Sequence, residues 1–290
     1  MKVFVTGATG FIGSALVPDL INAGHQVVGL ARSDAGAASL AAMGADVYRG
    51  SIEDLDSLKS TAATADGVIH LAFNHDFSRF AENSETDRRA IEALGEALTG
   101  SNRPLIITSG TGFTPGRPRT ENDAPAPVSA MVPRASEQAA ASVEARGVHV
   151  LVVRLPQVHD PFKQGIFTYA IAIAREKGIS AYIGDGLNRL PAVHRLDAAR
   201  LYKLVLEKGV AGTRYHAVAE EGVPVREVAE AIGRRLKIPV VSKSPEEASE
   251  HFGWLGPLMM SDMPASSAFT QERLGWHPTE VGLIADLATT

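Results

Sequence analysis

A glycine-rich segment close to the start of the chain constrains the fold more than any other feature. The apolar run Lys2–Thr6 predicts a buried strand, and the loop behind it carries three glycines, Gly7, Gly10 and Gly13. With this spacing the first glycine permits a tight turn, the second lets the backbone approach a diphosphate, and the third allows a helix to pack closely on the strand. Because Phe11–Ala23 has helical spacing, this context predicts a dinucleotide-binding loop.

Strand-like and helix-like segments alternate through the first half of the chain. Short runs rich in Val, Ile and Leu predict further strands at Gln26–Ala31, Asp46–Tyr48, Gly67–Leu71, Leu105–Thr108 and Val148–Val153. Between them lie segments of helical length, at Ala35–Met43, Leu55–Ala62, Glu82–Leu98 and Ala135–Ala145. Near-continuous apolar strands need cover on both faces, so we predict an α/β fold with a Rossmann-type doubly wound parallel sheet.

The alternation changes after residue 155, which predicts a second lobe. We expect residues 1–160 to form the dinucleotide-binding domain and residues 161–290 to form a smaller α/β lobe interleaved with it. The lobe is expected to contain helices and short strands at Ala181–Ile183, Asp197–Lys208, Arg214–Val218 and Val225–Leu236. An apolar segment, Phe252–Met260, is expected to pack in the core of this lobe or at a subunit contact, or else to cover a substrate pocket.

Two long polar segments follow predicted strands. Gly110–Pro133 and Pro156–Gly165 are rich in Pro, Gly and polar residues. Loops at the carboxyl ends of the strands are where such sheets bind ligands. Gly110–Pro133 is long enough to act as a lid.

The composition excludes several kinds of site and partner. Apolar residues make up 45% of the chain, and the net charge is −5 without a basic block, so we expect no nucleic-acid or membrane partner. The absence of cysteine excludes disulfides, thiolate zinc sites and cysteine nucleophiles. The histidines lack metal-ligand spacing, and we expect no metal. No apolar run approaches the roughly 20 residues of a membrane span, and we expect a cytoplasmic protein.

Motifs along almost the whole chain resemble those of a known family. Thr6–Gly13 resembles the TGxxGxxG signature of the extended short-chain dehydrogenases/reductases, the NAD-dependent epimerase/dehydratase-like family. Similar elements follow in order at His70–Ala72, Thr108–Thr111, Arg154–Val158, Val193–Ala199 and Leu274–Pro278. The resemblance implies a Rossmann-type fold and a pyridine-nucleotide cofactor.

The end of the second strand bears on which cofactor is bound. A carboxylate there suits the free 2′-hydroxyl of NAD, whereas an arginine accommodates the 2′-phosphate of NADP. Ala31 stands where NAD-preferring relatives carry Asp, and Arg32 and Ser33 offer donors to a phosphate. We therefore expect NADP(H) to be preferred and NAD(H) to be possible, although Asp34 tempers the preference. The alternative is that Arg32 is an ordinary surface residue.

The resemblance also implies contacts to the rest of the cofactor. Ser51 and Ile52 are expected beside the adenine, and Pro156 and Val158 beside the nicotinamide. The full predicted set comprises Gly7, Thr9, Gly10, Phe11, Ile12, Gly13, Arg32, Ser33, Ser51, Ile52, Leu71, Ala72, Phe73, Pro156 and Val158. Ordinary packing is the alternative for each apolar member.

The chain departs from the family at the proton donor. Relatives use a Tyr whose pKa is lowered by a Lys four residues later. None of the five tyrosines has such a Lys, and none lies in Val128–Ala140, where the motif belongs. Arg134 falls near the Lys position, where it can bond the nicotinamide ribose, but a guanidinium holds its protons too tightly to be a good acid. The alternative is a solvated arginine in the first turn of a helix.

Other groups are candidates for binding or protonating a substrate. Ser109 occupies the family's active-site Ser position, and it or Thr111 is expected to bind a substrate oxygen, unless both only cap the strand end. His75 and His159 follow predicted strands and are candidate proton donors, since histidine titrates near neutral pH. His194 is expected to have a structural or substrate-lobe role.

Three functions remain open at this point. The first is an NADP(H)-dependent oxidoreductase of the atypical short-chain type, acting on a small carbonyl, imine or activated alkene. The second is a non-catalytic NADP(H)-binding redox sensor, which the missing tyrosine favours. The third is a nucleotide-sugar epimerase or dehydratase, which normally needs that tyrosine. We expect a small-molecule substrate and, from the family, a possible homodimer through Glu82–Leu98 and Ala135–Ala145.

Overall fold

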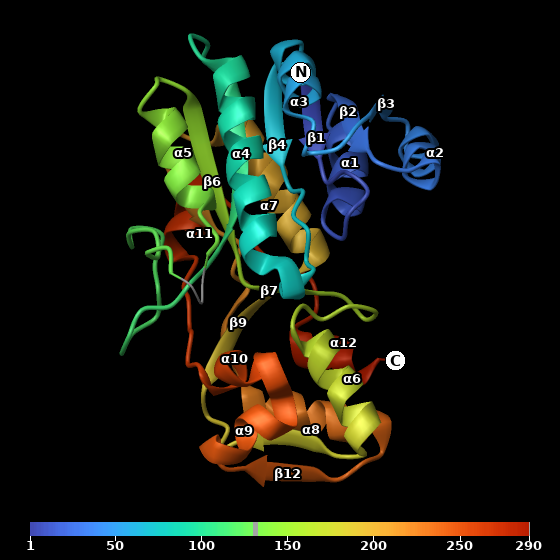
Figure 1. Cartoon of the computed structure of the whole chain (residues 1–290), viewed down its shortest axis with the longest axis vertical. Coiled ribbons are helices and arrows are strands. Elements are labelled where there is room, and N and C mark those ends of the chain that lie inside the picture. Colours follow the sequence, from blue (N-terminus) through green and yellow to red (C-terminus); the bar gives the residue numbers. More distant parts are fainter. Residues whose placement is uncertain (130–132, 290) are drawn as a thin grey trace.

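A parallel sheet of seven strands organises the protein. In the computed structural model, residues 1–129 and 133–289 are described (Figure 1). The strand order is β10-β6-β5-β4-β1-β2-β3, and every neighbouring pair is parallel. The strands are β1 (Lys2–Thr6), β2 (Gln26–Ala31), β3 (Asp46–Arg49), β4 (Gly67–His70), β5 (Pro104–Gly110), β6 (His149–Leu155) and β10 (Arg214–His216). The predicted Rossmann-type sheet is confirmed.

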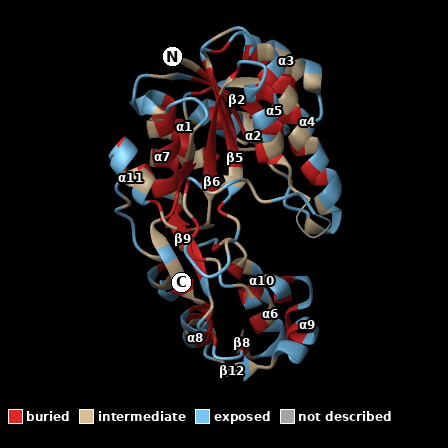
Figure 2. Ribbon diagram, turned by 90° about the vertical axis from the view of Figure 1, so that its left-hand side faces the viewer, coloured by how far each residue is buried: buried red, intermediate tan, exposed pale blue. Residues whose placement is uncertain are grey.

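Helices cover both faces of the sheet, because successive side chains of a strand point to opposite faces. Val3 and Val5 pack into one core with α1 (Gly13–Asn22) and α7 (Arg195–Lys208), whereas Phe4 packs into the other. That second core contains α3 (Leu55–Ala63), α4 (Phe80–Leu98) and α5 (Ser136–Glu144). The strands are accordingly buried between layers of helices, and α2 (Asp34–Ala42) packs on β2 and β3 (Figure 2).

A smaller lobe lies below the carboxyl ends of the strands in Figure 1. It has a three-stranded sheet, β11-β9-β7, and a parallel pair, β12-β8. Its strands are β7 (Gln157–His159), β8 (Ser180–Ile183), β9 (Arg189–His194), β11 (Glu220–Pro224) and β12 (Val240–Lys243). Its helices are α6 (Phe167–Lys177), α8 (Val225–Leu236), α9 (Pro245–Phe252), the 3₁₀ turn η2 (Gly253–Leu255), α10 (Gly256–Met260) and α12 (Leu283–Ala288). These elements enclose a third hydrophobic core.

The chain returns from this lobe to the large sheet. The expectation that Arg214–Val218 belongs to the smaller lobe is wrong, since β10 extends the large sheet by pairing with β6. α7 packs on α1, and α11 (Ala268–Leu274) contacts α7 and β10. Trp276 is buried in the same core and donates from Nε1 to the carbonyl of Asp197 at 3.1 Å. Local periodicity predicts a strand but not the sheet it joins, because that depends on which edge is free.

Candidate functional site

The glycine loop closes tightly between β1 and α1. Gly7 has φ of +67°, and a Cβ added there would lie 2.7 Å from the backbone nitrogen of Ala72. A Cβ on Gly13 would lie 2.1 Å from the carbonyl oxygen of Gly7. Gly10 donates its N–H to that same oxygen at 2.8 Å but is itself exposed. The loop therefore needs glycine at 7 and 13 for its own packing, while Gly10 leaves the backbone open to a ligand.

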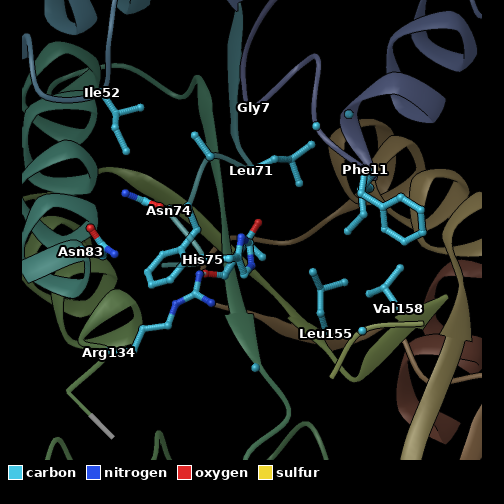
Figure 3. A pocket seen from close by; sticks show the side chains of 18 of the residues that line it. Gly7, Phe11, Ile52, Leu71, Asn74, His75, Asn83, Arg134, Leu155 and Val158 are labelled. Atoms are coloured by element: carbon cyan, nitrogen blue, oxygen red, sulfur yellow. The ribbon is translucent and has the colours of Figure 1, made fainter. Parts of the chain in front are cut away.

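A cavity of about 500 Å³ lies beside this loop, at the carboxyl edge of the sheet (Figure 3). Residues following β1, β4, β5 and β6 line it, where the strand order reverses between β1 and β4. This is the position at which doubly wound sheets bind ligands. Of the predicted site residues, those that line it are Gly7, Thr9, Gly10, Phe11, Ile12, Gly13, Arg32, Ser51, Ile52, Leu71, Ala72, Phe73, Ser109, Arg134, Pro156 and Val158.

The end of β2 presents an arginine to the cavity. Arg32 is exposed, and among the described residues it has no carboxylate partner. Asp34 instead pairs with Arg49 at the end of β3, Nη2 to Oδ1, 3.0 Å. Ser33 does not line the cavity, because its hydroxyl accepts from Gly36 N–H at 3.1 Å and so caps α2. Within the described residues, the Arg32 guanidinium is therefore available to an anionic ligand. The Asp34 carboxylate, which was expected to weaken the preference for NADP(H), is paired with Arg49.

Two cations from the second half of the chain approach the glycine loop. Lys163 Nζ lies 5.3 Å from the ring centroid of Phe11, and the Arg195 guanidinium lies 5.5 Å from it. Arg195 is paired with Asp160 at 2.9 Å, whereas Lys163 has no carboxylate partner within the described ranges. Sequence reasoning missed Lys163, although its place in the polar segment Pro156–Gly165 was a usable signal.

Arg134 is held rigidly at the other end of the cavity. Its Nε donates to the Ser136 hydroxyl at 2.8 Å, and its Nη2 donates to the carbonyl of Thr108 at 2.9 Å. Its guanidinium lies over the Phe73 ring, 4.3 Å from the centroid. In Figure 3 the side chain reaches from the start of α5 toward His75. This is not the solvated first-turn arginine of the alternative interpretation.

A buried carboxylate supports Arg134 from behind. Asp87 of α4 accepts from the Ser136 hydroxyl at 2.5 Å and contacts His70 Nε2 at 3.3 Å. Burial on its own raises the pKa of Asp87, but the His70 hydrogen bond and the Arg134 charge outweigh burial and lower it, so the group is ionised at neutral pH. His70 Nδ1 in turn lies 2.7 Å from the hydroxyl of Thr6. The network therefore connects β1 to Arg134.

Ser109 and Thr111 have different surroundings. Ser109 lines the cavity, in front of the buried carboxylate of Glu137. Burial raises the pKa of Glu137, but the bidentate Arg154 contact more than offsets this and the net shift is downward. Thr111 is buried outside the cavity, with its N–H donated to the carbonyl of Leu155 at 3.1 Å. Its position does not fit the expected contact with a substrate oxygen.

His75 and His159, the two histidines considered as proton donors, lie in different surroundings. His159 is fully buried outside the cavity, with Nδ1 2.6 Å from Asp286 of α12, so the expectation that it protonates a substrate is wrong. His75 lines the cavity, where enclosure and then the charges of Arg134 and Lys163 lower its pKa. It is therefore neutral at neutral pH. His194 caps α7 by accepting from Leu196 N–H, which fits its expected structural role.

The long segment after β5 is anchored away from the cavity. Its described part, 111–129, contributes no lining residue. Arg119 N–H donates to Pro264, and the carbonyl of Asp123 accepts from Arg154, both at 2.9 Å. The expected lid role is not supported for this part; residues 130–132 lie outside the described ranges.

Aromatic side chains line the cavity opposite the glycine loop. Phe73, His75 and Phe77 come from the segment after β4, and Tyr169 comes from α6. Trp254 of η2 lies behind them, stacked on Phe77 at 5.0 Å. The expectation for Phe252–Met260 is therefore met in part. Phe252, Leu255 and Met259 are buried in the lobe core, while Trp254 faces the aromatic rings of the other lobe.

Comparisons with known proteins agree with this geometry. The sequence profile described as the NAD dependent epimerase/dehydratase family matches residues 3–218. An uncharacterized protein of Schizosaccharomyces pombe is 51% identical over 100% of this chain and 99% of its own. The 2-alkyl-3-oxoalkanoate reductase of Stenotrophomonas maltophilia is 27% identical over 84% of this chain and 78% of its own. The chain belongs to the NAD-dependent epimerase/dehydratase family, which binds NAD(P).

Solved structures show the same fold. The dTDP-glucose 4,6-dehydratase DesIV of Streptomyces venezuelae, crystallised with NAD bound, superimposes with a TM-score of 0.77 at 22% identity, covering 99% of this chain and 95% of its own. Within residues 1–129 and 133–289, none of the helices has the length and apolar character needed to cross a membrane.

Proposed function

We propose that the protein is an NADP(H)-dependent oxidoreductase that acts on a small carbonyl, imine or activated alkene without a tyrosine proton donor. The observation that carries the proposal is the cavity itself. At one end it has a glycine loop with an unpaired Arg32, and at the other it has a fixed Arg134 beside Ser109. Similarity to a reductase of oxoalkanoates over most of both chains supports an oxidoreductase.

The residues of the glycine loop fit a dinucleotide. Backbone N–H groups at the start of α1 face the cavity, and a helix N-terminus favours a diphosphate. Lys163 supplies a further positive charge beside Phe11. Arg32 would hold the 2′-phosphate, with Ser51 and Ile52 beside the adenine and Pro156 and Val158 beside the nicotinamide. A bound cofactor of this type supplies or accepts a hydride.

The chain's own groups would handle the substrate oxygen. Arg134 and Ser109 would bind and orient it through N–H and O–H donors. The low pKa of His75 leaves little imidazolium at neutral pH, so we assign the proton to solvent entering the cavity.

Arg32→Ala tests the cofactor assignment by calorimetry with NADPH and NADH. Loss of one or two charge-assisted hydrogen bonds to a phosphate should weaken NADPH binding about 10- to 100-fold, with little change for NADH. Arg89→Ala, which removes an exposed arginine outside the cavity, is the matched control. Equal losses for both nucleotides would refute the assignment.

A redox sensor is the second candidate, because no Tyr–Lys pair at four-residue spacing exists in the chain. Incubation with NADPH and a panel of ketones, imines and enones separates the two. Turnover supports the oxidoreductase, and tight NADPH binding without any turnover supports the sensor. Conversion of a nucleotide sugar would instead support the epimerase or dehydratase chemistry known in the family.

A further inference from the structure

A wall of aromatic rings, here called the aromatic wall, crosses between the two lobes. It comprises Phe73, Phe77 and Tyr169, with Trp254 behind them. Phe77 lies 6.2 Å from Tyr169 edge-on, and Trp254 is stacked on Phe77 at 5.0 Å and 25°. Trp254 also meets Tyr169 edge-on at 5.2 Å. Each of the cavity-facing rings Phe77 and Tyr169 is therefore held by Trp254.

This wall is open to solvent. Tyr169 is 39% exposed and Trp254 is 51% exposed. Single exposed aromatic residues scattered over a surface are ordinary and need no explanation. A cluster of exposed aromatic rings beside a cavity instead marks a binding surface. Flat π-systems bind such rings by offset or edge-on stacking.

A fixed positive charge lies beside the wall. Arg134 covers one face of the Phe73 ring, and two of its nitrogens are engaged with Ser136 and Thr108. Its Nη1 has no hydrogen-bond partner within residues 1–129 and 133–289. Because the guanidinium is already immobilised, binding an oxygen anion there costs little side-chain entropy.

The charges around the cavity favour an anion. Of the lining residues, Arg32, Arg134 and Lys163 are cationic, and Glu53 is the one carboxylate among the described residues that line it. Arg134 brings positive charge to the end of the cavity beside the aromatic wall, while its ion-pair partner Asp87, 3.9 Å from Nε, is buried and does not line the cavity.

We propose that this end of the cavity binds a flat conjugated molecule bearing an acidic oxygen, such as an aromatic carboxylate. The rings would stack on Phe77 and Tyr169, and the oxygen would accept from Arg134 Nη1. The assignment deepens the proposed function by naming the substrate class, and its test uses binding without cofactor.

Cinnamate is the probe, titrated onto the full chain by calorimetry. 3-Cyclohexylpropanoate keeps the carboxylate but lacks the flat ring, and cinnamyl alcohol keeps the ring but lacks the charge. Cinnamate should bind about tenfold or more tightly than either, given the strength of a stacking pair or a charged hydrogen bond. Equal binding of cinnamate and 3-cyclohexylpropanoate would overturn the proposal.

Variants locate the site. Phe77→Leu and Arg134→Gln should each weaken cinnamate binding about tenfold. Phe113→Leu, which changes a ring that is 50% exposed but outside the cavity, should leave cinnamate binding unchanged. Unchanged binding in Phe77→Leu would exclude the aromatic wall. A thermal melt close to that of the unmodified protein shows that a variant is folded.

Tryptophan fluorescence gives an independent readout. Cinnamate should quench Trp254, while the buried Trp276 serves as an internal reference. Trp254→Phe should remove the quench but preserve binding, and a quench that survives it would contradict the assignment. If cinnamate binds but NADPH does not, the cofactor proposal fails and the aromatic-carboxylate proposal stands. If NADPH binds but cinnamate does not, the aromatic-carboxylate proposal fails and the cofactor proposal stands.

Discussion

Individual glycine and arginine residues illustrate how single positions determine the site. Gly7 and Gly13 are required by the packing of the loop itself, whereas Gly10 is open toward the cavity. Arg134 gains a fixed direction from Ser136 and Thr108, and ionised Asp87 keeps that arrangement in place.

Substituting the loop glycines separates packing from binding. Gly13→Ala places a Cβ 2.1 Å from the Gly7 carbonyl, so we expect lower stability together with loss of nucleotide binding. Gly10→Ala meets that oxygen at 3.0 Å, which the loop can relieve by a small shift. It should fold with nearly unchanged stability but bind nucleotide poorly. Thermal melts and calorimetry measure both, and tight NADPH binding by Gly10→Ala would contradict the assigned diphosphate contact.

Elements of the large sheet are joined by one buried ion pair. Arg154 at the end of β6 is completely buried and bonds Glu137 of α5 through Nε and Nη2, both at 2.8 Å. Glu137 also accepts from Arg214 of β10 at 3.0 Å. Strand, helix and edge strand are therefore fixed together by a buried Arg154–Glu137 pair and by a partly exposed Arg214.

Arg154→Met should destabilise the protein by about 3 kcal/mol, because it leaves a buried carboxylate with less compensation. The double variant with Glu137→Leu should lose clearly less than the sum of the two single variants. Arg226→Ala, which breaks an exposed pair with Glu230 on the surface of α8, should change the stability far less. Urea unfolding measures the change in unfolding free energy for Arg154→Met, Glu137→Leu, their double variant and Arg226→Ala. Additive losses would show that the pair is not coupled.

The stability of the whole molecule is expected to depend on buried neutral histidines. Burial lowers the pKa of His216 to about 4, and the nearby Arg154 and Arg119 charges act in the same direction. His216 Nδ1 lies 2.8 Å from the carbonyl of Ser266. Burial likewise lowers the pKa of His159. In the unfolded chain both histidines take up a proton as the pH falls through about 6.5, but in the folded chain they stay neutral at that pH. The stability of the folded protein therefore falls as the pH drops below about 6.5.

His216→Asn should reduce this pH dependence. Between pH 7 and pH 5 the unmodified protein should lose about 2 kcal/mol more of its unfolding free energy than the variant. Over this interval His216 takes up a proton in the unfolded chain, where its pKa is near 6.5. It does not do so in the folded chain, where its pKa is about 4. Urea denaturation at both pH values is the measurement. Parallel losses in the two proteins would show that His216 is not the titrating group.

Much of the fold and of the nucleotide-binding loop was determined by the sequence alone. Apolar runs set the strands, and the glycines at 7, 10 and 13 set the loop, because local geometry depends on adjacent residues. Arg32 was predictable for the same reason, since it ends a recognisable strand.

Only the tertiary structure decided how distant residues meet. Asp87 supports Arg134 from another helix, Lys163 approaches Phe11, and Trp254 joins the aromatic wall from the smaller lobe. Burial of His159 against Asp286 removed a candidate proton donor in the same way. Such contacts depend on how helices and lobes pack together, which residue periodicity does not specify.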